Sequence, residues 1–146
     1  MDEFSSHSLN IDADRALFEG QISNLVLTFY ENESPPCGLL GLLDWRFHGK
    51  ISKFIRQGAL SGQLGECSYL PFKKNDRVFH LLLIGAGAAQ KPGLRLPLAK
   101  TALKVLEKNL SALKWSKIGV SKSDFGDVNS DFFIQNFKGV PLWITL

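Results

Sequence analysis

Residues 49–87 read GKISKFIRQGALSGQLGECSYLPFKKNDRVFHLLLIGAG, and this stretch decides the fold of the chain. Its first part predicts a helix over residues 50–57, because apolar side chains recur there at the spacing of one helix face. These side chains are Ile51, Phe54 and Ile55. Gly58 follows directly, and glycine commonly ends a helix in the left-handed conformation. We therefore expect a short amphipathic helix that leads into a glycine-containing loop.

Two apolar segments follow this loop, and they indicate a β-hairpin. Residues 67–72 form the first and residues 77–84 the second, and the polar residues 73–76 separate them. A connection this short joins neighbouring antiparallel strands. The second segment runs into Gly85 and Gly87, where we expect the strand to have ended and a loop to begin.

The rest of the chain alternates strand-like and helix-like patterns. In chain order, the remaining predicted elements are a short extra strand near 13–18, a strand over 21–30, a helix over 39–47, a helix over 94–113, a strand over 117–120, a helix over 127–137 and a strand over 140–146. Strands that alternate with helices favour an α/β protein. We predict a three-layer α/β/α sandwich built on a mixed sheet, in which the hairpin supplies the antiparallel part.

The length and composition fit one globular domain. The chain has 146 residues, of which 45% are hydrophobic and 21% are charged. Residues 1–10 are polar and show no periodicity, so we expect a flexible N-terminus followed by a single domain over residues 11–146. The formal net charge of +3 is too small to indicate a dedicated nucleic-acid binder.

Cysteine content and apolar runs indicate a cytoplasmic protein. The two cysteines, Cys37 and Cys67, are too few for a disulfide scaffold, and we expect both to be reduced. The first ten residues have no apolar core of a signal peptide. The longest apolar run, residues 81–89, is about half the length that crosses a membrane.

The central glycines carry a family resemblance. The pattern comprises Asp44 with Gly49, then Gly58, Gly62, Gly65 and Glu66, then Gly85 and Gly87. In this order it resembles the amino-terminal domain of the leucine aminopeptidases (peptidase family M17), a relative of the macro domains. The resemblance covers Leu25 to Leu146 and is specific in its middle third. It implies a macro-domain-like fold.

The resemblance also implies what is missing. Catalysis in the aminopeptidase family resembles two-metal hydrolysis by a carboxyl-terminal domain with Lys, Asp and Glu ligands, which we expect to be absent here. We therefore expect a non-catalytic domain with no catalytic residue, no metal site and no cofactor. Macro domains that bind ADP-ribose place consecutive glycines in their first loop, whereas this chain has leucines there, at 39, 40, 42 and 43. Their adenine-contacting Asp has no counterpart that the pattern identifies.

The candidate ligand residues are small residues in two segments. They are Gly38, Gly41, Gly85, Ala86, Gly87 and Ala88. A small-residue loop before a helix offers backbone N–H groups to a phosphate, and Lys91 and Arg95 would add positive charge. The segment lacks the Gly-Lys-Ser/Thr ending of a P-loop. A purely structural strand-to-helix connection is therefore the alternative, and the more common outcome.

Two basic regions are candidate surfaces for anions. Lys100, Lys104 and Lys108 lie four residues apart on the predicted helix over 94–113, and further basic residues occur within residues 46–56. Such a row is more often the solvated face of an amphipathic helix. Nucleic acid is accordingly a less favoured partner, and no membrane contact is expected.

The favoured function is a stand-alone domain with a role in assembly or regulation, through self-association or contact with another protein. The second hypothesis is a module that binds a nucleotide or an ADP-ribose-type ligand, since the predicted element order is macro-like. A hydrolase that processes ADP-ribose ranks last, because no water-activating group stands beside the glycine loops.

Overall fold

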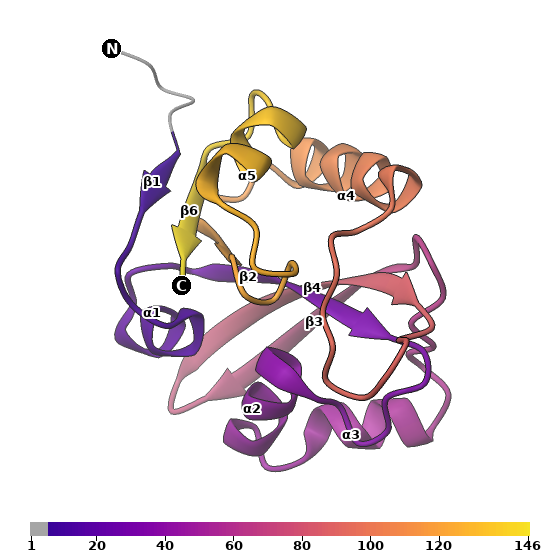
Figure 1. Cartoon of the computed structure of the whole chain (residues 1–146). Helices are drawn as coiled ribbons and strands as arrows, with labels where there is room; N and C mark the ends of the chain where they lie inside the picture. Colours follow the sequence, from indigo (N-terminus) through magenta and orange to yellow (C-terminus); the bar gives the residue numbers. More distant parts are fainter. Residues whose placement is uncertain (1–5) are drawn as a thin grey trace.

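The computed structural model describes residues 6–146, which form one six-stranded sheet with helices on both of its faces (Figure 1). The elements are β1 (His7–Ser8), α1 (Ala13–Glu19), β2 (Asn24–Tyr30), α2 (Gly38–Arg46), α3 (Lys50–Arg56), β3 (Cys67–Lys74), β4 (Arg77–Gly87), α4 (Lys100–Leu113), β5 (Ile118–Ser121), α5 (Ser130–Asn136) and β6 (Leu142–Thr145). Within these residues no helix combines the length and apolar character needed to span a membrane.

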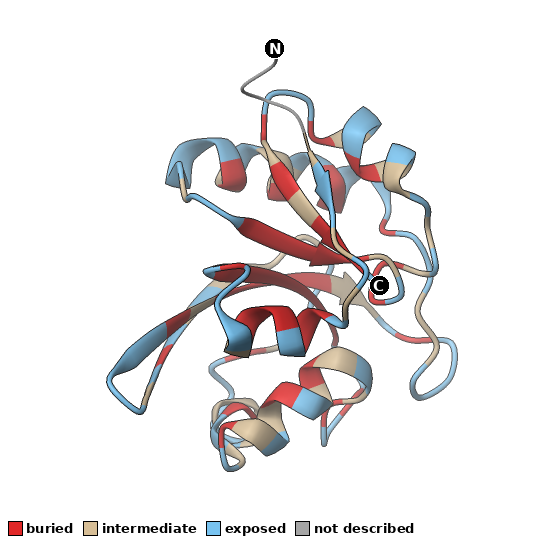
Figure 2. Ribbon diagram, turned by 90° about the vertical axis from the view of Figure 1, so that its left-hand side faces the viewer, coloured by how far each residue is buried: buried red, intermediate tan, exposed pale blue. Residues whose placement is uncertain are grey.

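The sheet is mixed, as predicted. Its strand order is β1-β6-β5-β2-β4-β3, and all neighbouring pairs are parallel except β3 with β4. One hydrophobic core lies between the sheet and α1, α2 and α3, and a second lies between the sheet and α4 and α5. Figure 2 shows the buried central strands between these two layers of helices. The prediction of a three-layer α/β/α sandwich is confirmed.

Strand β2 lies at the centre of the sheet. All seven of its residues are buried, and it pairs with β4 on one side and β5 on the other. A strand covered on both faces needs apolar side chains at nearly every position, which explains the continuous apolar pattern of this segment.

The predicted hairpin is present, and its second strand is longer than expected. Cys67 pairs with Ile84 and Lys74 pairs with Arg77 in antiparallel register. Strand β4 continues through Gly87, so Gly85 and Gly87 belong to the strand and not to the loop after it.

The predicted short strand near residues 13–18 is wrong. This segment is helix α1, which buries Ala13, Ala16 and Leu17 against the sheet and ends at Gly20 in the left-handed conformation. The positions i, i+3 and i+4 of these residues are the helical signal. The segment is only seven residues long, so the signal is short.

Two predicted helices begin later than expected. Helix α4 starts at Lys100 instead of residue 94, because the backbone before it is held by other contacts: Leu96 N–H donates to the Tyr30 hydroxyl at 3.2 Å. Helix α5 starts at Ser130 instead of residue 127, where the Asn129 carboxamide accepts a hydrogen bond from Phe132 N–H at 3.1 Å. Asparagine is a strong N-cap, and it sets this boundary.

The segment that was expected to be flexible, residues 1–10, includes the first strand of the sheet. His7 and Ser8 form β1, in parallel pairing with Trp143 and Ile144 of β6. The His7 ring stacks on the Trp143 ring with centroids 4.3 Å apart. Residues 1–5 lie outside the described residues.

Candidate ligand-binding groove

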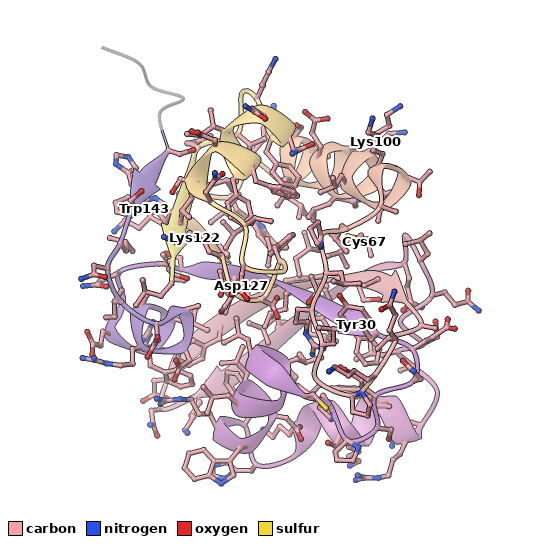
Figure 3. All side chains as sticks on the ribbon, viewed as in Figure 1. Tyr30, Cys67, Lys100, Lys122, Asp127 and Trp143 are labelled. Atoms are coloured by element: carbon pink, nitrogen blue, oxygen red, sulfur yellow. The ribbon has the colours of Figure 1, made fainter. Side chains whose placement is uncertain are left out.

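The carboxyl ends of the parallel strands β2, β4, β5 and β6 meet at one edge of the sheet. Open α/β sheets bind their ligands at this edge, in crevices formed by the segments that follow the strands. Figure 3 shows Lys122 and Asp127 on the segment that follows β5. Two hollows lie at this edge.

The first hollow lies between the start of α2 and the end of β5. Its volume is about 300 Å³, and its lining includes Asp12, Gly38, Leu39, Ser121 and Ser123. Asp12 comes from the N-cap position of α1, and its carboxylate makes no capping hydrogen bond. The lining thus combines a free carboxylate, two hydroxyl groups and the beginning of a helix.

The second hollow continues from the first around the segment after β5. Its volume is about 620 Å³, and it is lined by Lys122, Ser123, residues 127–131 and Leu146. Both hollows are bordered by Ser123 and Leu146, so they adjoin each other, and we call the pair the carboxyl-edge groove.

The N-terminus of α2 gives this groove an anion-binding element. No hydrogen bond is made by the N–H groups of Gly38, Leu39 and Leu40 within residues 6–146. Cys37 is the N-cap, and its side chain does not cap the helix. Uncapped N–H groups and the helix dipole both favour a negative charge at this position. Gly38 has a φ of 64°, in the left-handed region that glycine adopts more readily than other residues. A glycine therefore suits this position, where the chain enters α2 beside the groove.

The leucines of α2 fill the groove only in part. Leu40 and Leu43 are buried in the core beneath α2, whereas Leu39 and Leu42 line the first hollow. Of the four leucines that stand where other macro domains have glycines, two therefore line the groove and two belong to the core. Gly41, the second candidate of this segment, serves packing: a Cβ there would lie 2.5 Å from the carbonyl oxygen of Pro36.

The other candidate glycines lie outside the groove, and their backbones are already bonded. Gly85 N–H donates to the Glu66 carbonyl at 2.6 Å, and Gly87 N–H donates to the Gly62 carbonyl at 2.9 Å. A Cβ on Gly85 would collide with the Gln63 carbonyl. These glycines let the 62–66 loop pack against β4.

Ala86 and Ala88 line a separate hollow of about 240 Å³. Its other lining residues are mostly apolar: Tyr30, Leu64, Gln90, Leu94, Leu96, Pro97, Leu98 and Ala99. The structure thus brings Gly38 into the carboxyl-edge groove but not residues 85–88. A phosphate-binding role for the latter stays a prediction, and the geometry of the groove does not depend on it.

The Gly-Glu part of the sequence pattern has a structural explanation. The Glu66 carboxylate accepts hydrogen bonds from Ser61 N–H at 3.1 Å and from Gly62 N–H at 2.8 Å, and the Ser61 hydroxyl donates to it at 2.8 Å. Burial raises the pKa of Glu66, but these hydrogen bonds outweigh burial and leave its pKa below the ordinary value. Glu66 therefore acts as a fixed internal anion that shapes the loop.

A buried ion pair forms one wall of the edge. The Arg95 guanidinium donates to the Glu33 carboxylate at 2.8 Å, and the two side chains are only 7% and 2% exposed. Arg95 also donates to the Cys37 carbonyl at 2.8 Å, which ties the N-cap of α2 to the segment before α4. The sequence analysis suggested that the positive charge of Arg95 would bind a phosphate. In the folded chain Arg95 instead pairs with the carboxylate of Glu33.

Glu33 also binds the backbone of the segment formed by residues 88–99. Its carboxylate accepts a second hydrogen bond from Gly93 N–H at 2.9 Å. Burial raises the pKa of Glu33, while Arg95 and Gly93 lower it by more, so the net shift of this pKa is downward. The guanidinium of Arg95 and the N–H group of Gly93 therefore already bind a carboxylate of the chain itself.

Asp124 connects this ion pair to the segment after β5. One carboxylate oxygen accepts from Thr28 N–H at 2.8 Å, and the other lies 3.8 Å from Arg95 Nε. Those last two atoms are buried and have no hydrogen-bond partner within the described residues. Burial raises the pKa of Asp124 to about 6, against the lowering effect of Thr28 and Arg95.

Sequence reasoning missed most of the residues that line the groove. Asp12, Ser121, Ser123 and Asp127 carry no recognisable motif. The available signal was positional, since residues 121–127 directly follow a predicted parallel strand whose carboxyl end must lie at the ligand-binding edge.

Comparison of the sequence with protein-family models and with curated proteins gives no match. Comparison of the structure with solved structures does give matches. A mutant of tomato leucine aminopeptidase is similar with a TM-score of 0.62 at 14% identity, over 99% of this chain. The match covers 32% of the aminopeptidase, its N-terminal part, so this chain spans about a third of that enzyme's length.

Macrodomains match over their own full length. The macrodomain of Mycobacterium tuberculosis DarG is similar with a TM-score of 0.62 at 14% identity, over 97% of this chain and 98% of the macrodomain. Thermosipho africanus DarTG in complex with ADP-ribose has a TM-score of 0.60 at 10% identity, over 99% of this chain and 42% of that chain. The chain therefore has the macro-like fold shared by macrodomains and the amino-terminal part of a leucine aminopeptidase, as the sequence resemblance implied.

Proposed function

We propose that this protein is a binding module for a nucleotide-type ligand of the ADP-ribose class, held in the carboxyl-edge groove. The observation that carries the proposal is the uncapped N-terminus of α2 in the lining of a hollow of about 300 Å³, which adjoins a second hollow of about 620 Å³. Pockets that hold whole small ligands have volumes in this range.

The distribution of charge along the groove supports a ligand of mixed character. Asp12 and Asp14 line the first hollow together with Ser121 and the N-terminus of α2, whereas Lys122, Asp127 and Asp131 line the second, and Ser123 borders both. Carboxylates accept hydrogen bonds from amino and hydroxyl groups, and a helix N-terminus favours phosphate. The helix N-terminus favours a phosphate group, and the carboxylates favour the hydroxyl and amino groups of a sugar and a base, so we expect a nucleotide-type ligand to bind more tightly than inorganic phosphate.

The structural neighbours support the same ligand class. The DarTG structure contains ADP-ribose, and the fold of this chain is similar to it over 99% of its length. At 10% identity this likeness concerns the fold alone. The ligand of that protein suggests which ligand to test, and the case for binding rests on the groove of this chain.

We propose further that the module binds its ligand without turning it over. Within residues 6–146 no group of three His, Cys, Asp or Glu side chains is placed to hold a metal ion. The most strongly shifted carboxyl group, Asp124, is fully buried behind the groove wall, where it cannot touch a ligand. Release of ADP-ribose from a modified substrate, or of leucine from a leucyl amide with Mn²⁺ or Zn²⁺ added, would contradict this part of the proposal.

Isothermal titration calorimetry with ADP-ribose tests the binding. We expect saturable binding to the unmodified chain and its loss in Ser123→Trp, which puts an indole at the point shared by both hollows. Ser111→Trp is the matched control, because Ser111 is exposed on α4 and lines neither hollow. Absence of heat at millimolar ADP-ribose, or equal loss in both variants, would overturn the proposal.

A second candidate function is protein contact through the outer face of α2. Trp45 is 76% exposed and Leu42, one turn earlier on the same helix, is 41% exposed. Large exposed aromatic side chains are enriched at protein interfaces. This observation favours the assembly role that the sequence analysis preferred, with self-association as its simplest form.

Sedimentation velocity over a range of concentrations tests this second candidate. Self-association that is present in the unmodified chain and absent in Trp45→Ser would support it. Ile134→Ser is the control, because Ile134 is exposed to a comparable degree as Leu42 but lies on α5. A monomer at all concentrations would remove self-association.

A further inference from the structure

We propose that a hollow between α4 and α5, separate from the carboxyl-edge groove, binds a small oligophosphate anion. Three lysines from two parts of the chain line it: Lys100 and Lys104 belong to α4, and Lys138 follows α5. The remaining lining residues are Leu103, Glu107, Gln135 and Asn136. Figure 3 shows Lys100 well apart from the groove residues Lys122 and Asp127.

The three ammonium groups are not neutralised by the protein. Within residues 6–146, Lys100, Lys104 and Lys138 make no ion pair and no hydrogen bond, and Glu107 is the only acidic side chain in the lining. The hollow therefore carries an excess of positive charge. Lysines from separate elements that converge on one hollow, unlike a row along a single helix, match the shape of a compact anion.

The first turn of α4 has an electrostatically unfavourable composition. Lys100 occupies the first turn of α4, where the helix dipole favours acidic side chains, and no acidic residue is present there. Ala99, the N-cap residue, provides no side-chain hydrogen bond. Functional sites often contain residues that are locally unfavourable. An anion bound in this hollow would offset the unfavourable interaction between Lys100 and the dipole of α4.

The size of the hollow restricts the ligand. Its volume of about 260 Å³ lies at the lower limit of pockets for whole small molecules. It accommodates a short phosphate chain, either free or as the terminal part of a nucleotide whose base stays outside. The amide groups of Gln135 and Asn136 add neutral donors beside the lysines.

Calorimetry with sodium tripolyphosphate tests the site. We expect binding that weakens by at least about tenfold in Lys104→Glu/Lys138→Glu, because two attractive charges become repulsive at close range. The control is Lys53→Glu/Lys73→Glu, which changes the net charge equally but lies on α3 and β3, away from the hollow, and it should alter the affinity by less than about twofold. Equal weakening in both variants, or no binding to the unmodified chain at millimolar tripolyphosphate, would overturn the proposal.

An NMR titration of the unmodified chain makes the test independent of how the variants fold. Tripolyphosphate should shift the amide signals of Lys100, Lys104 and Lys138, whether or not it also shifts those of the groove residues Gly38 and Ser123. Adenosine triphosphate is the second probe. Shifts at the same lysines with both probes would assign the hollow to any phosphate chain, and shifts with tripolyphosphate alone would assign it to the free anion. Shifts confined to the groove residues would contradict the proposal.

Discussion

Arg95 and Glu33 form a buried ion pair, with Arg95 Nη1 and Glu33 Oε2 2.8 Å apart. Glu33 lies on the segment after β2 and Arg95 on the segment before α4, so the pair joins two walls of the sheet edge on which the carboxyl-edge groove lies. A hydrogen bond from Arg95 to the Cys37 carbonyl extends the connection to the N-terminus of α2. The pair therefore fixes the backbone at the N-terminus of α2, which lines the groove.

Arg95→Met should destabilise the fold by about 3–5 kcal/mol, because it leaves the carboxylates of Glu33 and Asp124 buried without their cation. Urea unfolding monitored by circular dichroism measures this loss. Arg15→Met is the control: Arg15 pairs with Glu19 on the surface of α1, and loss of an exposed pair costs about 0–1 kcal/mol. Similar stabilities of the two variants would contradict the structural role of Arg95.

The stability of the protein should rise as the pH falls from 7 towards 5. Burial raises the pKa of Asp124 to about 6 from an ordinary value of 3.8, so the native state binds a proton in this range that the unfolded state does not. The slope is at most about 1.4 kcal/mol per pH unit for one group. Below this range the sign reverses, because Glu33 and Glu66 have lowered pKa values and their stabilisation is lost on protonation.

Asp124→Asn isolates this pH effect, since an amide at position 124 cannot take up the proton. The free energy of unfolding, measured in urea at pH 7, 6 and 5, should increase on acidification in the unmodified chain and change less in the variant. The charged groups nearest to Asp124 are Arg95 and Glu33, and both stay ionised over this range. A stability that falls between pH 7 and pH 5 in both proteins would refute the assignment.

Gly85→Ala should lower the free energy of unfolding by about 3 kcal/mol, since the added methyl group has no space beside the Gln63 carbonyl. Gly58→Ala serves for comparison. Gly58 has a φ of 77° but open space around it, so only the cost of the left-handed conformation applies, about 1–2 kcal/mol. If Gly85→Ala were the better tolerated of the two, the packing role of Gly85 would be wrong.

Glu66→Gln should destabilise the protein by about 1–3 kcal/mol, because hydrogen bonds from Ser61 and Gly62 to a charged carboxylate become weaker bonds to a neutral amide. Thermal unfolding at pH 7 measures the effect. Glu107→Gln is a matched change on α4, where Glu107 makes no hydrogen bond within the described residues, and its effect should stay within about 0.5 kcal/mol. Equal effects would show that the Glu66 interactions contribute nothing.

The sequence was most informative where patterns are long. The alternation of strands and helices and the hairpin predicted the α/β/α sandwich, because buried parallel strands and amphipathic helices leave clear periodicities, and the glycine pattern carried the resemblance to macro domains. Two short elements near the N-terminus escaped prediction. Helix α1 has seven residues and β1 has two, and their stability comes from packing on the sheet and pairing with β6.

The site was less predictable than the fold, because its residues are brought together by tertiary structure alone. Arg95 looked like a ligand for phosphate, yet Glu33, 62 residues away in sequence, already occupies its guanidinium. Asp12 and Ser123 line the groove although nothing in their sequence neighbourhoods distinguishes them from ordinary surface residues. Only Gly38 was both predicted and found at the groove.

An amide NMR titration with ADP-ribose tests the central claim most directly. The account predicts saturable shifts at Gly38, Leu39, Ser121, Ser123 and Asp127, the residues that surround the N-terminus of α2 and the segment after β5. Shifts centred on residues 85–88, or no shifts at millimolar ADP-ribose, would contradict it.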